Sequence, residues 1–80
     1  MHYVKPLHRQ HVQSAAVRSV GYDEADWLLQ VEFADGKVCN YFRVPPEEHS
    51  RLRSAPALEA YLSREIEPYF ESEEAETAHA

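Results

Sequence analysis

The sequence contains few cysteine, glycine and basic residues, and it has no long apolar run. Its one cysteine, Cys39, cannot form a disulfide within the chain, and four cysteine or histidine residues at zinc-finger spacing are absent. No stretch approaches the roughly 18 apolar residues that a membrane-spanning helix needs. Eight lysine and arginine residues against 14 aspartate and glutamate residues give a net charge of -6. This charge argues against a general polyanion-binding protein, whose domain is normally basic.

The length of 80 residues allows one small domain. Residues 1–11 include three histidines but lack the continuous apolar segment of a secretory signal, so we predict a flexible N-terminal arm and a cytoplasmic protein. Residues 71–80 contain four glutamates and no large apolar side chain, so we predict a disordered acidic tail. The predicted domain, residues 12–70, carries six basic and ten acidic residues, so its acidity does not depend on the tail.

Two segments are predicted to form a β-hairpin. Residues 27–34 and 37–44 are rich in apolar and aromatic side chains, and the first segment alternates with a period of two. Asp35 and Gly36 lie between them. This pair is typical of a two-residue type I′ turn, in which both central residues have positive φ.

The two-residue turn sets the predicted register, and the register assigns each side chain to one face of the sheet. Phe33 then lies opposite Val38, and Leu29 lies opposite Phe42. The face predicted to be buried consists of Trp27, Leu29, Val31, Phe33, Val38, Phe42 and Val44. The face predicted to be mixed and partly exposed consists of Leu28, Gln30, Glu32, Lys37, Cys39, Tyr41 and Arg43.

A third strand and two short helices complete the predicted fold. Residues 15–22 are predicted to form the third strand, with a bulge near Ser19 that brings Val17 and Val20 to one face. After this sheet, Pro46 suits the first turn of a helix. The fold class is therefore α+β, a three-stranded antiparallel sheet with two short C-terminal helices packed on one face.

The two predicted helices have recognisable ends and apolar stripes. The first helix turns His49 and Leu52 inward, and Ser54 is predicted to cap the second helix. The stripe of the second helix, at spacings of three and four, consists of Leu58, Tyr61, Leu62, Ile66 and Tyr69.

Several short motifs follow one another in a characteristic order. These are GYD at residues 21–23, LQVEF at residues 29–33, DG at residues 35–36, an aromatic strand, and VP at residues 44–45. In this order the chain resembles the KTSC domain family, a short domain found at the C-terminus of some lysyl-tRNA synthetases and as stand-alone bacterial proteins. The similarity covers about residues 12–70, and Tyr41 matches the second tyrosine of the family's central Tyr-x-Tyr. The resemblance implies the α+β fold, and the synthetase context implies RNA binding as a candidate function.

The candidate catalytic residues lack the partners that catalysis requires. Cys39 needs a nearby base, but its predicted cross-strand neighbour is Glu32, which raises rather than lowers the pKa of a thiol. His49 has no identifiable group to orient it as a general base. His8 and His11 are three residues apart, a spacing that places two side chains on one side of a helix, but no third metal ligand is nearby. We therefore expect neither a metal nor another cofactor. We therefore predict that the protein is not an enzyme.

The mixed sheet face carries the candidate binding residues, which are Tyr41, Arg43, Lys37, Arg18, Leu28 and Gln30. As an RNA-binding module, this face stacks Tyr41 on an unpaired base while its cations meet phosphate. As a protein-binding module, it uses an apolar patch of Leu28, Cys39 and Tyr41, or an exposed sheet edge that pairs with a partner strand. A solvated face without binding function is the remaining interpretation. We expect a small non-enzymatic module that binds a protein, with RNA binding as the alternative.

Overall fold

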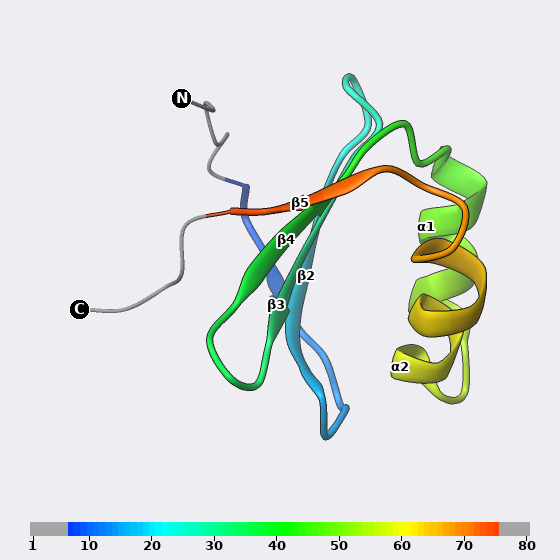
Figure 1. Ribbon diagram of the computed structural model, residues 1–80. Helices are drawn as coiled ribbons and strands as arrows, with labels where there is room; N and C mark the ends of the chain where they lie inside the picture. The colour runs from blue at the N-terminus through cyan, green and yellow to red at the C-terminus, as the bar shows by residue number, and fades with distance from the viewer. Residues whose placement is uncertain (1–6, 76–80) are drawn as a thin grey trace.

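A five-stranded antiparallel sheet, with its strands in sequence order, forms one layer of the domain (Figure 1). The computed structural model describes residues 7–75. The strands are β1 (Gln10–His11), β2 (Val17–Asp23), β3 (Leu28–Phe33), β4 (Val38–Tyr41) and β5 (Ser72–Glu74). The three predicted strands correspond to β2, β3 and β4. The prediction of three strands is wrong because β1 and β5 add to the two edges of the sheet.

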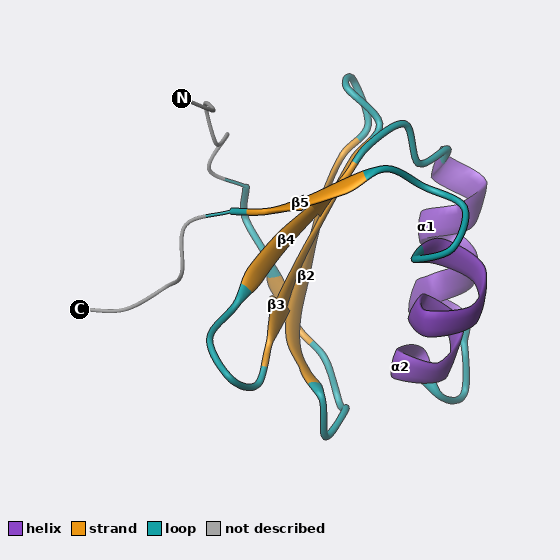
Figure 2. Cartoon of the chain, viewed as in Figure 1, coloured by secondary structure: helices purple, strands orange, loops and turns teal. Residues whose placement is uncertain are grey.

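The described helices all pack on one face of the sheet, as Figure 2 shows. They are α1 (Pro46–Ser54), α2 (Leu58–Tyr61) and the π-helical segment η1 (Leu62–Ile66), which continues directly from α2. α1 has Pro46 in its first turn, together with two glutamates, and two arginines in its last turn, an arrangement that suits the helix dipole. The predicted α+β class, with the helices on one face of an antiparallel sheet, is confirmed. We call the opposite face of the sheet the outer face.

The predicted cap of the second helix and the last residue of its predicted apolar stripe are wrong. Ser54 is the last residue of α1, and α2 begins after the extended residue Ala57 without a side-chain cap. Tyr69, predicted to extend the apolar stripe, is 72% exposed. The stripe ends at Ile66 because the chain turns away from the helix at residues 67–69.

β2 contains the predicted bulge. Its pairing with β3 shifts between Val17 and Ser19. Val17 and Val20 are both buried in the core, although strict alternation would place them on opposite faces. The extra residue of the bulge explains how one strand buries both valines.

The turn between β3 and β4 is one residue longer than predicted. The loop has three residues, since the Phe33 N–H donates to the Lys37 carbonyl at 2.8 Å and the Gly36 N–H donates to the Phe33 carbonyl at 3.0 Å. Gly36 has φ 96°, whereas Asp35 is not among the described residues with positive φ. A type I turn followed by one left-handed glycine fits these features, and a type I′ turn does not.

This longer loop shifts the register by one residue and reverses the faces of β4. Leu29 lies opposite Tyr41 rather than Phe42. Cys39 and Tyr41 therefore face the helices, while Asn40 faces away from them. The buried core that joins sheet and helices consists of Val17, Val20, Leu29, Val31, Tyr41, Val44, Leu52, Leu58, Leu62 and Ile66.

Two aromatic residues predicted to be in the core lie outside the strands. Trp27 ends the turn between β2 and β3 with φ 53°, and it is 45% exposed. Phe42 follows β4 and is partly exposed. The predicted strands extended too far at both ends, so the alternation of side chains does not hold for these two residues.

Both predicted chain ends contain residues of the sheet. β1 lies within the predicted flexible arm, and β5 lies within the predicted disordered tail. β5 pairs with β4 through backbone hydrogen bonds, which need no apolar side chains, and the Ala75 N–H donates to the Val38 carbonyl at 2.6 Å. The remaining parts of these two predictions, residues 1–6 and 76–80, lie outside the described residues.

Candidate functional site

The predicted binding residues do not form one exposed face. Arg18, Leu28 and Gln30 do lie on strands with their side chains toward the outer face, but Leu28 and Gln30 are buried. Lys37 directly precedes β4, where its carbonyl accepts from the Phe33 N–H beside the three-residue loop. The other two residues, Tyr41 and Arg43, lie elsewhere in the molecule.

Tyr41, the predicted stacking residue, is 2% exposed. Its hydroxyl donates to the Glu67 carboxylate at 3.2 Å. Burial, together with the nearby charge of Glu67, raises the pKa of Tyr41. A ring enclosed beneath the helices cannot stack on a base, so the predicted aromatic and basic face is not present.

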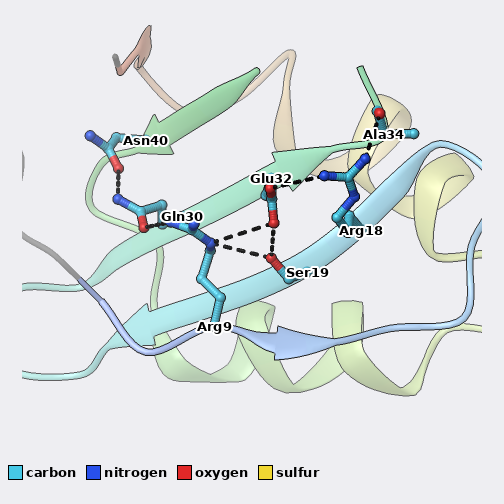
Figure 3. Close-up of polar contacts among 7 residues, drawn as sticks. All are labelled: Arg9, Arg18, Ser19, Gln30, Glu32, Ala34 and Asn40. Atoms are coloured by element: carbon cyan, nitrogen blue, oxygen red, sulfur yellow. Dashed lines mark hydrogen bonds and ion pairs between the residues drawn. The ribbon is translucent and has the colours of Figure 1, made fainter. Parts of the chain in front are cut away.

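Polar side chains are buried on the outer face instead. Ser19, Gln30 and Asn40 are each at most 5% exposed, and they come from β2, β3 and β4. The Gln30 amide donates to the Asn40 side-chain oxygen at 2.9 Å (Figure 3). Buried amides normally need such partners, because an unsatisfied group costs about 1–3 kcal/mol.

Arg9 joins this polar row from the segment before β1. Its Nε donates to the Ser19 hydroxyl at 3.2 Å, and its terminal N–H donates to the Gln30 side-chain oxygen (Figure 3). The Arg9 side chain crosses Gly21, where an added Cβ would lie 2.9 Å from Arg9 Cγ. A glycine at this position is therefore required for the arginine to reach Gln30.

Glu32 is the acidic member of the same cluster. It accepts a hydrogen bond from the Ser19 hydroxyl at 2.8 Å, and its carboxylate is 4.0 Å from Arg9 and 3.4 Å from Arg18. Arg18 also donates to the Ala34 carbonyl at 3.0 Å, which keeps its guanidinium beside the carboxylate. The carboxylate thus has two cations and a hydroxyl around it, so the outer face is not a free basic surface.

A cleft of about 350 Å³ lies between α1 and the edge of the sheet. The side chains with polar groups that line it are His8, Gln10, Tyr22, Glu24, His49 and Arg53. His49 stacks on Tyr22 with ring centroids 4.3 Å apart and planes 11° apart. Its Nε2 atom is buried and has no hydrogen-bond partner among the described residues.

Two candidate catalytic groups have pKa values that favour their neutral forms. Burial, and secondarily Arg53, lowers the pKa of His49, although Glu24 opposes the shift. Burial, and secondarily Glu74 and Glu67, raises the pKa of the Cys39 thiol. A neutral thiol is a weak nucleophile.

Trp27 and Arg43 form an exposed pair at one end of the sheet. They are the two described residues other than glycine with positive φ, at 53° and 61°. The Val44 N–H donates to the Trp27 carbonyl at 2.9 Å, so the two loops that carry them are side by side. Arg43 is 85% exposed and has a 3.9 Å ion pair with the exposed Glu71. We call Trp27 and Arg43 the tryptophan–arginine surface.

Sequence reasoning misses the roles of Arg9 and Trp27. Arg9 depends on Gly21, twelve positions away, and the available signal is a glycine inside a strand, which often marks a close approach of other atoms. Trp27 was assigned to the core by alternation. Its position directly after the acidic turn at residues 23–26 is the signal that places it outside the strand.

The described residues can also be searched for a metal site and for a membrane-spanning helix. His8 lines the cleft, and His11 belongs to β1. Residues 7–75 contain no group of three or more histidine, cysteine, aspartate or glutamate side chains placed to hold a metal ion. Within the same range no helix has the length and apolar character to cross a membrane.

Comparison with known proteins decides the family. A family model, the KTSC domain, matches residues 13–70. The chain belongs to the KTSC domain family. The match begins after Arg9 and β1 and ends before β5, so the two edge strands lie outside the matched KTSC region. Membership of the family, predicted from the motifs, is confirmed.

Two relatives and one solved structure, the latter a KTSC domain protein, are similar to this chain over most of its length. A protein from Stutzerimonas stutzeri is 36% identical over 62 residues, covering 78% of this chain and 87% of that protein. A protein from Tsukamurella paurometabola is 33% identical over 61 residues, covering 76% and 91%. The crystal structure of a KTSC domain protein from Yersinia pestis, 25% identical, matches with a TM-score of 0.84 and covers 89% of this chain and 100% of that chain.

Proposed function

We propose that this KTSC protein is a cytoplasmic, non-enzymatic module that binds a protein partner through the tryptophan–arginine surface. The observation that supports the proposal is the exposure of both side chains on left-handed backbone. A non-glycine residue in this conformation costs about 1–2 kcal/mol. Backbone strain of this kind clusters at functional sites.

Backbone hydrogen bonds of Phe42 and Val44 hold the chain on both sides of Arg43, but the Arg43 side chain itself gains little from contacts within the fold. Its ion pair with Glu71 is long and exposed on both sides, and such pairs contribute about 0–1 kcal/mol. Tryptophan and arginine are also the residue types that contribute most often to the binding energy of protein interfaces. An exposed pair of these types therefore favours a contact with another molecule.

The charges around this surface favour a basic protein over RNA. Three acidic residues precede Trp27, Asp23 at the end of β2 and Glu24 and Asp26 in the turn, and Glu71 lies beside Arg43. Such a negative environment repels phosphate and attracts a basic partner. The burial of Tyr41 also removes the stacking residue on which the RNA hypothesis depended.

The test is crosslinking of the partner to the full chain. A photoreactive group placed near Trp27 should capture one partner from a cell extract, with saturation and competition by unlabelled protein. Unlabelled Trp27→Ala should need at least tenfold higher concentration than the unlabelled wild type to compete for the partner. A tryptophan at an interface commonly contributes 2 kcal/mol or more to binding, which is roughly 30-fold in affinity. Tyr69→Ala is the matched control, since Tyr69 is another exposed aromatic residue.

Two results would argue against the proposal. If Trp27→Ala competes as well as the wild type, the tryptophan is not in the contact. If the full chain instead binds single-stranded RNA at low salt, with an affinity that falls steeply with salt and with Arg43→Ala, RNA binding is the better account.

A further inference from the structure

We propose that the outer face contains a guanidinium-binding site that recognises an arginine side chain of an extended partner segment. The site, which we call the arginine slot, is formed by Ser19, Gln30 and Glu32 (Figure 3), together with Gly21. In the isolated chain Arg9 occupies it. We call residues 7–11, which carry Arg9, the arm. The inference rests on the proposed protein-binding function but concerns a different surface.

The arginine slot matches the shape and charge of a guanidinium group. Ser19 accepts from Nε, Gln30 accepts from a terminal N–H, and the Glu32 carboxylate lies 4.0 Å from Nε. Guanidinium groups offer five N–H donors in one plane and carry a fixed charge, so they can meet several acceptors at once. A lysine ammonium is a compact point charge on a flexible stem and lacks the planar fork of donors, so it matches these separated acceptors less well.

Gly21 opens the path by which the side chain enters. An added Cβ at Gly21 would lie 2.9 Å from Arg9 Cγ and 3.0 Å from the His8 carbonyl oxygen. The glycine thus admits both an arginine stem and the backbone that carries it. The arginine slot is therefore shaped for an extended segment and not for an isolated side chain.

Few of the contacts that hold the arm bury apolar surface. β1 has two residues, and it pairs with Val20 and Ser19 of β2. Beneath Arg9 the sheet presents the polar side chains of Ser19 and Gln30, which water can hydrogen-bond when the arm leaves. Segments with little buried apolar surface open at a small fraction of the free energy of global unfolding.

A partner segment can replace the contacts that the arm makes. When the arm leaves, β2, seven residues long, becomes an edge strand with free backbone groups. An extended segment pairs with such an edge, and specificity then comes from the pockets that receive its side chains. An arginine beside Gly21 supplies that specificity. The net charge of -6 also draws a basic segment toward this protein.

The experiment uses the full chain and a peptide with the sequence of residues 7–13, acetylated and amidated. In the wild type, Arg9 competes with the peptide from the same molecule, so binding is weak. In Arg9→Ala the arm keeps its backbone pairing with β2 but loses the guanidinium contacts, so it competes less well and the peptide should bind at least tenfold more tightly. Its NMR shift changes should centre on Ser19, Gly21 and Gln30. A peptide with lysine in place of arginine should bind Arg9→Ala at least tenfold more weakly.

Two further variants serve as controls. Arg18→Ala removes the other cation beside Glu32 but leaves Arg9 in place, so the peptide should bind it as weakly as the wild type. Adding Gly21→Val to Arg9→Ala blocks the path of the stem, and peptide binding should be lost. Trp27→Ala should not change peptide binding, so this test and the test of the tryptophan–arginine surface can fail separately.

Specific outcomes overturn the inference. Equal affinity for the arginine and lysine peptides shows that no guanidinium site exists. Equal affinity of the wild type and Arg9→Ala shows that Arg9 does not occupy the site of binding. If circular dichroism shows Arg9→Ala to be unfolded, Arg9→Gln is measured in its place. If that variant is also unfolded, the arm is an essential part of the fold and not a replaceable occupant, which likewise contradicts the inference.

Discussion

Substitutions at Arg43 can distinguish the stability of the fold from the proposed function. Glycine adopts a φ of 61° without the clash of a Cβ, so we expect Arg43→Gly to raise the free energy of unfolding by about 1 kcal/mol. The lost side chain is 85% exposed, so little packing is removed. Thermal unfolding should then shift upward by about 4–8 °C.

Arg43→Ala is the matched control for this prediction. Alanine removes the same side chain but keeps the Cβ and therefore the strain, so its stability should stay close to that of the wild type. Equal melting temperatures for the glycine and alanine variants would show that the backbone at residue 43 is not strained. If Arg43 also contacts the partner, both variants should bind the partner more weakly.

His49 makes the stability of the protein depend on pH. Burial holds its folded-state pKa below the ordinary value of 6.5, with Arg53 adding to the shift and Glu24 opposing it. The unfolded chain therefore binds the proton more readily. The contribution of neutral His49 is complete above pH 6.5, and it is lost as the pH falls from 6.5 through the lowered pKa. Urea unfolding at a series of pH values measures this loss.

The variant that isolates this effect is His49→Phe. Phenylalanine can keep the stacking on Tyr22 but does not titrate, so the fall in stability below pH 6.5 should become shallower. His11→Phe is the control, because it places the same substitution at an exposed position on β1 and leaves His49 in place, so the loss that depends on His49 should remain. An unchanged slope in His49→Phe would contradict the prediction.

At the scale of elements, hydrophobic alternation predicted strands more reliably than it predicted their pairing. The pattern at residues 28–33 assigned Leu29 and Val31 to the buried face correctly, because both lie in one strand. Pairing depends on the loop, and Asp-Gly pairs occur in both two-residue and three-residue turns. One additional loop residue therefore buried Tyr41, and with it the central residue of the predicted site was lost.

The loop between β3 and β4 can be tested at Gly36. A φ of 96° suits glycine, so Gly36→Ala should lower the free energy of unfolding by about 1–2 kcal/mol. The free energy of unfolding of Gly36→Asn should lie between those of the wild type and Gly36→Ala, since asparagine tolerates left-handed backbone better than alanine does. Urea unfolding gives the order. An alanine variant as stable as the wild type would show that the loop can adopt another turn without loss.

At the scale of the whole molecule, length and composition predicted a single acidic domain and the residue patterns predicted its α+β class, but neither predicted the size of its sheet. Segments β1 and β5 lack the apolar side chains by which strands are recognised in a sequence. They join the sheet because β2 and β4 present unpaired backbone groups at their edges. The arginine slot was equally invisible, since it brings together Arg9, Gly21 and Gln30 from three separate segments.

The position of β5 has a consequence for how the protein folds. Every other strand lies next to its neighbour in the chain through a short connection, whereas both helices intervene between β4 and β5. Closing this long connection costs more conformational entropy than closing a hairpin does. The hairpins can therefore form early and locally, and β5 can pair lastingly only once the helices have docked. We therefore expect this strand to pair last and, in doing so, to tie the helical layer to the sheet.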